Sequence, residues 1–408
     1  MDKPWMMDVL THLSTIGRTK DNGSHRLAYS NEDDLARDYF IGLMKKAHLN
    51  VRVDAVGNII GRLEGQDPHA GAIATGSHID TVPNGGHYDG MTGAVAGLAA
   101  LMRLQKRGAL KHPLELIIFQ MEESSRFAMA TFGSKAMTGK ISQDIAKTLT
   151  DKDGIPLPLA MERVGLDIEK METAVRQKGE IDAFIELHIE QSPTLELNNL
   201  GVGIVKAIAA PIRTHVKVIG KASHSGGTAM NQRKDALVTA SEVVLAVNEV
   251  ANAYASKDIV GTVGNLVVKP GAINVVPGEV DLWIDLRGIN RAAMDAAQAE
   301  IEKRVREIEK KYGTPIHLKP LVSDNPVTMS PEIIEVLGQS AQALGIATMQ
   351  LPSGAGHDAM NMGSLAKVGM IFIRNKDGLS HHPLEYASPD DIALGVDLLT
   401  EALYRLAK

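Results

Sequence analysis

The sequence predicts an α/β protein with a mostly parallel sheet and helices on both faces, into which a smaller ferredoxin-like α+β domain is inserted. Up to about residue 210, short apolar runs alternate with amphipathic stretches, as in chains that build a parallel sheet from strands and crossover helices. Residues 212–327 follow the order βαββαβ, which is typical of a ferredoxin-like unit. The length of 408 residues also exceeds the roughly 250–300 residues of a single core. We therefore expect two domains, residues 1–211 with 328–408 and residues 212–327.

The first domain is expected to alternate between helix and strand. Residues 32–47 place apolar side chains at a period near 3.6, and Ser30 precedes them as a helix cap. Several apolar runs are continuous rather than alternating, which indicates strands covered on both faces. Beside a helix at residues 93–106, the expected strands are residues 51–63, 72–77, 114–121, 183–189 and 368–374.

The inserted domain is expected to contain two helices and four strands. In chain order these are a strand at residues 213–219, a helix at 235–253, strands at 259–268 and 279–286, a helix at 292–312 and a strand at 316–321. The second helix carries a charged run in which Glu302 and Arg306 lie four residues apart. Such a run is typical of a solvated helix face.

Composition argues against several classes of function. The net charge is −6, and 43 basic and 49 acidic residues are spread along the chain, so no basic stripe offers itself to a nucleic-acid partner. The absence of cysteine removes disulfides, thiolate nucleophiles and Cys-based zinc sites. The longest apolar run identified, residues 94–102, is far shorter than the roughly 20 residues of a membrane helix. We therefore expect a cytoplasmic protein with no membrane partner.

Candidate metal ligands fall at or near the ends of the predicted strands. Four of them lie at or close to a strand end, and the fifth, Asp89, lies in a glycine-rich loop. Ligands gather at the carboxyl ends of the strands in open α/β sheets. The set comprises His78, Asp89, Glu123, His188 and His381.

These five residues can hold two divalent metal ions such as Zn²⁺, Mn²⁺, Co²⁺ or Ni²⁺. Two neighbouring ions need a bridging carboxylate, and Asp89 is the natural bridge because the surrounding glycines let its loop fold back over the site. His78 and His188 would complete one ion, and Glu123 and His381 the other.

The remaining chemistry is assigned to two acidic residues. Glu122, next to the ligand Glu123, is the candidate general base that takes the proton of the attacking water. Asp80 would orient the His78 ring through its second nitrogen. Taken singly, a histidine after an apolar strand is more often a core or surface residue than a ligand, so the argument depends on five such elements in this order.

In the segments around these candidate residues, the chain resembles the zinc-dependent aminoacylase and carboxypeptidase G superfamily, and within it the N-carbamoyl-L-amino acid hydrolases, allantoate amidohydrolases and β-ureidopropionases. The resemblance covers nearly the whole chain. His188 favours this branch, because the peptidases usually have a carboxylate at that position. The motifs are Gly76-Ser77-His78-Ile79-Asp80-Thr81-Val82, Asn84-Gly85-Gly86-His87-Tyr88-Asp89-Gly90, Met121-Glu122-Glu123-Ser124-Ser125-Arg126-Phe127, Glu186-Leu187-His188-Ile189-Glu190-Gln191 and Gly378-Leu379-Ser380-His381-His382-Pro383-Leu384-Glu385.

The resemblance implies a homodimer joined through the inserted domain, and a small ureido carboxylate as substrate. In relatives, the counterparts of His224 and Asn274 reach the active site of the partner subunit. Arg287 is expected to bind the substrate carboxylate, which a planar guanidinium fork suits. His224 could donate a hydrogen bond to the oxyanion of the tetrahedral intermediate. The implied substrate contacts are Gln191, His224, Asn274, Arg287, Gly356 and His357, of which His224 also acts in catalysis.

The leading hypothesis is hydrolysis of an N-carbamoyl-L-amino acid to the amino acid, carbon dioxide and ammonia. Allantoate has the same carboxylate-plus-carbamoyl geometry and is the nearest alternative. Departures from the family pattern at Ser124, Ala229 and His382 affect substrate fit more than metal binding. An aminoacylase or dipeptidase would share Glu122, and a non-catalytic binding protein would be expected to lack that base or the bridge Asp89.

Overall fold

The computed structural model describes residues 3–108 and 110–408, which form two compact units. Unit 1 comprises Met1–Lys206 and Met329–Lys408, and unit 2 comprises Ala207–Thr328. The crossings therefore lie close to those expected at residues 211/212 and 327/328. The first lies earlier because Ala207 and Ile208 pair with Thr328 and Val327, so the two crossing segments are grouped with unit 2.

Unit 1 is built on a mixed sheet whose central strands are parallel. The central strands are, in spatial order, β4 (Leu114–Phe119), β3 (Ala72–His78), β5 (Ile181–Ile189) and β15 (Lys367–Ile373). Every residue of β3 and β4 is buried, as expected for strands covered on both faces. The predicted α/β class is confirmed, with antiparallel strands added at both edges of the parallel centre.

At one antiparallel edge, residues 51–63 differ from the single strand that the sequence predicts. The sequence predicts one strand there, and the structure has a hairpin of β1 (Asn50–Val53) and β2 (Ile59–Leu63). The Asp54 carboxylate accepts hydrogen bonds from the backbone N–H groups of Val56 and Asn58 and so closes the turn between them. At the other edge lie β6 (Val202–Ile208), β13 (Val327–Thr328) and β14 (Gln350–Ser353).

Helices cover both faces of this sheet. One face carries α3 (Met91–Gln105) and α12 (Pro389–Ala407), with α1 (Lys3–Thr15), α2 (Asn31–Lys46) and α10 (Pro331–Leu344) in the same core. The other carries α4 (Phe132–Met137) and α11 (Ala359–Met362), with α5 (Gln143–Thr148), α6 (Leu157–Arg163) and the 3-10 helix Ile168–Ala174 near α4. Shorter connections are α7 (Thr194–Leu197) and the 3-10 turn Lys376–Gly378. The Ser30 side chain caps α2, as predicted.

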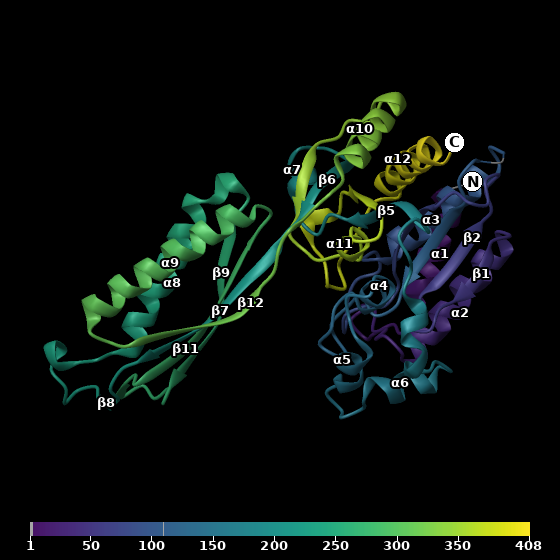
Figure 1. Cartoon of the computed structure of the whole chain (residues 1–408). Helices are drawn as coiled ribbons and strands as arrows, with labels where there is room; N and C mark the ends of the chain where they lie inside the picture. The colour runs from purple at the N-terminus through teal and green to yellow at the C-terminus, as the bar shows by residue number, and fades with distance from the viewer. Residues whose placement is uncertain (1–2, 109) are drawn as a thin grey trace. The chain divides into compact units, whose positions relative to one another are not determined.

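Unit 2 has the ferredoxin-like arrangement that the sequence predicts. Its four antiparallel strands are, in spatial order, β12 (Ile316–Ser323), β7 (Ala210–Ile219), β11 (Glu279–Gly288) and β9 (Val260–Lys269). Helices α8 (Ala236–Ala253) and α9 (Arg291–Tyr312) lie side by side on one face of this sheet (Figure 1). A separate pair of short strands, β8 (Ser223–His224) and β10 (Val275–Val276), completes the unit with the 3-10 turns Met230–Gln232 and Ala255–Lys257.

Helix α8 is, by length and composition alone, long and apolar enough to cross a membrane, which was not expected from the sequence. The reason is that Ser241 and Glu242 interrupt its apolar run. In the structure its buried residues, which include Ala240, Val243 and Val247, belong to the core of unit 2. The apolar character of α8 is therefore explained by its packing in the core of unit 2.

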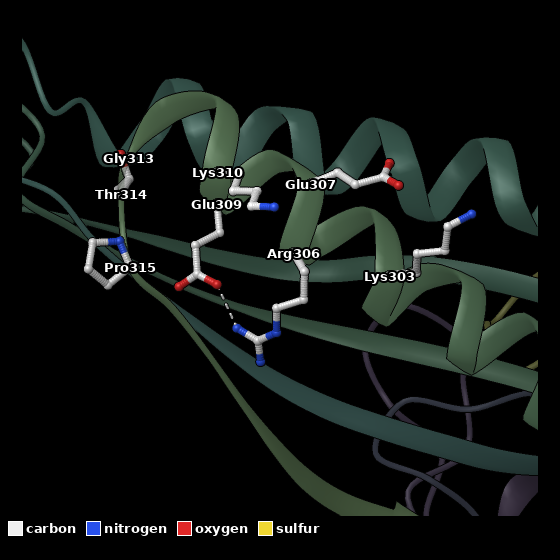
Figure 2. A pocket seen from close by; sticks show the side chains of 8 residues that line it. All are labelled: Lys303, Arg306, Glu307, Glu309, Lys310, Gly313, Thr314 and Pro315. Carbon is white, nitrogen blue, oxygen red and sulfur yellow. Dashed lines mark hydrogen bonds and ion pairs between the residues drawn. The ribbon is translucent and has the colours of Figure 1, made fainter.

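A pocket of about 760 Å³ lies against the C-terminal half of α9 (Figure 2). It is lined by Lys303, Arg306, Glu307, Glu309, Lys310, Gly313, Thr314 and Pro315. Arg306 forms an ion pair with Glu309 at 2.8 Å. None of the predicted site residues lines this pocket, and its charged lining agrees with the solvated helix face expected from the sequence.

Candidate metal centre and substrate contacts

The five predicted metal ligands come together at one edge of the parallel strands in unit 1. His78 ends β3, His188 is the last residue but one of β5, and Glu123 follows β4 after a short turn. His381 follows β15 after the turn Lys376–Gly378. Because these four strands are parallel neighbours, their carboxyl ends bring the side chains to the same place.

The ligands form two clusters that share Asp89. Asp89 Oδ1 lies 3.4 Å from His78 Nε2 and 3.2 Å from His188 Nε2. Asp89 Oδ2 lies 3.5 Å from His381 Nε2, and the same nitrogen lies 3.1 Å from Glu123 Oε1. Within each cluster the ligand atoms are all within 4.8 Å of one another. Imidazole and carboxylate donors in this arrangement fit two divalent ions with Asp89 between them.

The electrostatics of the clusters favour a cation. Burial on its own would raise the pKa of Asp89, but His188 and His78 hold that pKa well below its usual value. Burial would likewise lower the pKa of His188, but the Asp89 carboxylate raises it. The hydrogen bond with Glu123 raises the pKa of His381 to about 9. Protons thus offset the carboxylate charge, and metal binding is expected to displace them.

Gly90 allows the Asp89 loop to pack against His78. Its φ is +66°, a conformation that residues with a Cβ rarely adopt. A Cβ at this position would also lie 2.4 Å from the His78 ring. The glycine-rich loop predicted from the sequence is therefore needed for close approach and for the start of α3.

Asp80 contacts the loop of Glu122 and Glu123 as well as the His78 ring. His78 Nδ1 lies 3.1 Å from the backbone carbonyl oxygen of Asp80 and 3.6 Å from its carboxylate. The Asp80 carboxylate accepts hydrogen bonds from the backbone N–H groups of Glu122 at 3.2 Å and Glu123 at 3.1 Å. Asp80 therefore connects His78 with the loop that carries the candidate base.

Glu122 lies beside the first cluster without belonging to it. Its carboxylate is 3.8 Å from His78 Nε2 and is buried. Burial raises the pKa of this carboxyl well above its usual value, and the neighbouring Glu123 adds to the effect. This is the placement expected of a group that exchanges a proton with a ligand held at the clusters.

Three further residues form hydrogen bonds with Asp89 or with the backbone of its loop. Glu385 Oε1 accepts hydrogen bonds from the backbone N–H groups of Tyr88 at 2.8 Å and Asp89 at 3.0 Å. Ser380 Oγ donates a hydrogen bond to Asp89 Oδ2 at 2.6 Å. In the sequence, only their spacing around His381 points to Glu385 and Ser380. The predicted substrate contact Gln191 donates to the same oxygen of Asp89 at 2.7 Å, while its buried Oε1 has no hydrogen-bond partner among the residues that the structure describes.

The loop at residues 353–358 divides into an exposed and a buried part. Gly356 is exposed, but the predicted substrate contact His357 is buried at 2% exposure. The His357 ring lies 4.6 Å from the His188 ring, and its Nε2 is 2.9 Å from Ser353 Oγ. Burial and the neighbouring His188 lower the pKa of His357 well below its usual value, so it is neutral. The structure thus places the His357 side chain against the candidate ligand His188, and the substrate contact expected of His357 stays a prediction.

The remaining predicted contacts lie in unit 2, where two of them are neighbours. His224 pairs with Val275 between β8 and β10, and the Asn274 carbonyl accepts a hydrogen bond from Ser225. His224 Nδ1 accepts hydrogen bonds from the backbone N–H groups of Gly226 and Gly227, which in a neutral ring leaves the proton on Nε2.

Arg287 lies near the end of β11. Its Nη2 donates a hydrogen bond to Asp285 Oδ2 at 3.0 Å, and Asp285 Oδ1 lies 3.5 Å from Arg213 Nε. The carboxylate of Asp285 therefore sits between two guanidinium groups on the same sheet.

Comparison with known proteins agrees with this geometry. A model of the peptidase family M20/M25/M40 matches residues 74–405. The N-carbamoyl-L-amino acid amidohydrolase of Geobacillus stearothermophilus is 36% identical over 400 residues, covering 98% of this chain and 97% of that protein. The allantoate amidohydrolase of Bacillus subtilis is 35% identical over 405 residues, covering 98% and 97%.

Two further relatives extend the comparison. The ureidoglycolate hydrolase of Arabidopsis thaliana is 36% identical over 414 residues, covering 100% of this chain and 87% of that protein. Among solved structures, an amidase of the hydantoinase/carbamoylase family from Burkholderia multivorans superimposes with a TM-score of 0.94 at 31% identity, covering 100% of this chain and 98% of that one. The chain therefore belongs to peptidase family M20/M25/M40 and is a hydrolase related over nearly its whole length to amidohydrolases.

Proposed function

We propose that the protein hydrolyses the carbamoyl group of an N-carbamoyl-L-amino acid, so that one water and one substrate give the amino acid, carbon dioxide and ammonia. The observation that carries this proposal is the pair of ligand clusters sharing Asp89, with the buried Glu122 carboxylate beside them. The full-length similarity to amidohydrolases supports it.

Each part of such a substrate finds a matching group in the chain. Two divalent ions held by the clusters would polarise the ureido carbonyl and make the attacking water more acidic. Glu122 accepts the proton of that water and delivers it to the leaving nitrogen. Gln191 Oε1, which is buried and has no hydrogen-bond partner in the described part of the chain, can accept a ureido N–H.

Two groups of unit 2 complete the proposed set. His224, with its proton on Nε2, donates a hydrogen bond to the oxygen that becomes negative in the tetrahedral intermediate. Arg287 binds the substrate carboxylate with its planar fork. The substrate carboxylate would then displace the Asp285 carboxylate from Arg287, and Asp285 could keep its ion pair with Arg213.

Allantoate and ureidoglycolate are the alternative substrates, and both also combine a carboxylate with a ureido group. Allantoate follows from the sequence and from the Bacillus subtilis relative. Ureidoglycolate is suggested only by the similarity to the Arabidopsis thaliana relative. An aminoacylase or dipeptidase remains the alternative within the same family.

Ammonia release from a substrate panel tests the proposal. The panel contains several N-carbamoyl-L-amino acids, one N-carbamoyl-D-amino acid, allantoate, ureidoglycolate and 3-ureidopropionate, each with and without Mn²⁺ or Zn²⁺. N-acetyl amino acids and dipeptides are followed by amine release. The highest kcat/KM is expected for an N-carbamoyl-L-amino acid. Cleavage of only N-acetyl amino acids or peptides would contradict the proposed reaction.

Replacing Arg287 with Ala is expected to raise KM for the ureido substrate by about 10- to 100-fold, because a charged hydrogen bond contributes about 1.5–3 kcal/mol. The change in kcat should be smaller, since Arg287 is proposed to bind a group remote from the scissile bond. Steady-state kinetics provide the measurement. Arg291→Ala, which removes a half-exposed arginine paired with Asp295, is the matched control. An unchanged KM in Arg287→Ala would refute its role.

We further propose a homodimer formed through unit 2. Strand β9 is an edge strand of its sheet, and residues 260–268 contain no charged residue and no proline. Such an uncovered edge is prone to pair with another strand. By contrast, the opposite edge strand β12 carries Lys319 and Pro320. Large apolar side chains are exposed on β9 and the adjacent α8, namely Val238, Leu245, Val260, Leu266 and Val267.

The dimer proposal is tested by complementation between subunits. Inactive His224→Ala and Glu122→Gln proteins, mixed and allowed to exchange subunits, should recover activity if His224 acts in the site of the partner. Mixed dimers would then contain one site with both residues intact. A Val267→Lys variant should be monomeric by light scattering and should fail to complement. No recovery from dimers that demonstrably exchange would show that each chain completes its own site.

A further inference from the structure

Arg26 is a wholly buried cation in the loop between α1 and α2. Its Nε donates a hydrogen bond to the carbonyl oxygen of Ile79 at 2.6 Å. Its Nη1 donates to the carbonyl oxygens of Leu13 at 3.0 Å and Ile16 at 2.9 Å, and its Nη2 contacts the sulfur of Met91. The guanidinium therefore joins the end of the first helix to two segments that carry metal ligands.

The partners of Arg26 are unusual for a buried arginine. Among the described residues, the Arg26 side chain forms no hydrogen bond to a carboxylate. Two other largely buried arginines in the chain pair directly with acids, Arg176 with Glu115 and Arg126 with Asp151. Burying a charge is costly unless the charge is paired and hydrogen-bonded. Arg26 instead donates hydrogen bonds to the backbone carbonyl oxygens of Leu13, Ile16 and Ile79.

The segments held by Arg26 flank two of the candidate ligands. Ile79 lies between His78 and Asp80, and Thr81 is joined to the Arg26 backbone in both directions, by its Oγ1 and by its N–H. Met91 is the first residue of α3, and its N–H donates a hydrogen bond to the carbonyl oxygen of Asp89. One side chain thus ties the segment of His78 to the segment of Asp89.

We propose that Arg26 is a positioning residue that sets the separation of His78 and Asp89 for metal binding. The inference rests on the metal centre of the proposed function. Groups behind metal ligands orient them and affect metal affinity. The fork reaches Ile79 and Met91 at once through different nitrogens, which the single ammonium of lysine cannot reproduce. Burial lowers the pKa of Arg26 only to about 10, so it stays charged at neutral pH.

Metal titration of Arg26→Lys and Arg26→Met tests this role. Metal-free protein is titrated with Mn²⁺ or Zn²⁺ by calorimetry, and the Co²⁺ form is examined by visible absorption, which reports ligand geometry independently of activity. Both variants should bind metal about 10- to 100-fold more weakly than the wild type, and the Co²⁺ spectrum should change. With metal added to saturation, kcat should fall more than KM rises.

The matched control is Arg176→Lys, which alters a shielded arginine bonded to Glu115 and should leave metal affinity and the Co²⁺ spectrum unchanged. If the Arg26 variants do not fold, Met91→Leu removes only the sulfur contact and should still weaken metal binding. Wild-type metal affinity and Co²⁺ spectrum in folded Arg26→Lys, or in Met91→Leu if that variant alone folds, would overturn the inference. A wild-type protein that binds no metal would instead refute the metal centre itself.

Discussion

Replacing Glu122 with Gln is expected to lower kcat by about 10²- to 10⁴-fold, the range that general acid–base catalysis contributes. Gln has nearly the same shape but cannot accept the proton of the attacking water. Metal content should remain at the wild-type level, because Glu122 lies beside the clusters and belongs to neither. Ammonia release and elemental analysis of the same sample provide the two measurements.

The control for this variant is Glu162→Gln, which changes an exposed glutamate in α6 and should leave kcat unchanged. The backbone N–H of Glu122 still binds Asp80 in the variant, so the loop should keep its position. Wild-type kcat in Glu122→Gln would remove Glu122 as the base. Loss of metal together with activity would show that Glu122 acts as a ligand.

Replacing Asp89 with Asn is expected to weaken metal binding at both clusters, since Asp89 is the member that they share. Asn has one carbonyl oxygen and no negative charge, so it cannot bridge two ions as a carboxylate does. The loop should persist, because Glu385 binds the backbone N–H groups of Tyr88 and Asp89 rather than the Asp89 side chain. Activity should fall to the level of the metal-free protein.

The measurement is metal content after dialysis against buffer with a fixed free Mn²⁺ concentration. Asp8→Asn, an exposed aspartate of α1, is the control and should bind as much metal as the wild type. Circular dichroism checks that both proteins are folded. Retention of both ions by Asp89→Asn would contradict a shared bridging carboxylate.

The features that could be predicted from the sequence depend on local pattern. A continuous apolar strand followed by a polar residue marks the carboxyl end of a parallel strand, which is why His78, Glu123, His188 and His381 could be assigned to one edge. The fold class was predicted from such patterns and the family from the resemblance of the motifs around these residues, and both are confirmed. Asp89 could be added because the glycines around it indicate a loop that approaches closely.

The features that the sequence did not predict depend on contacts between distant segments. Arg26 has no local pattern, and its role follows only from the approach of Ile79 and Met91. His357 follows a glycine-rich stretch that resembles an exposed binding loop, yet packing against His188 buries it. The hairpin at residues 50–63 was missed because its turn is closed by the Asp54 side chain. The cytoplasmic location stays a prediction.

The most direct test of the central claim is ammonia release from the preferred N-carbamoyl-L-amino acid by metal-free protein to which Mn²⁺ or Zn²⁺ is added back in steps. A site with two clusters that share Asp89 predicts almost no activity without metal and full activity only after two equivalents per chain. Full activity in the metal-free protein, or after a single equivalent, would contradict the two-metal account.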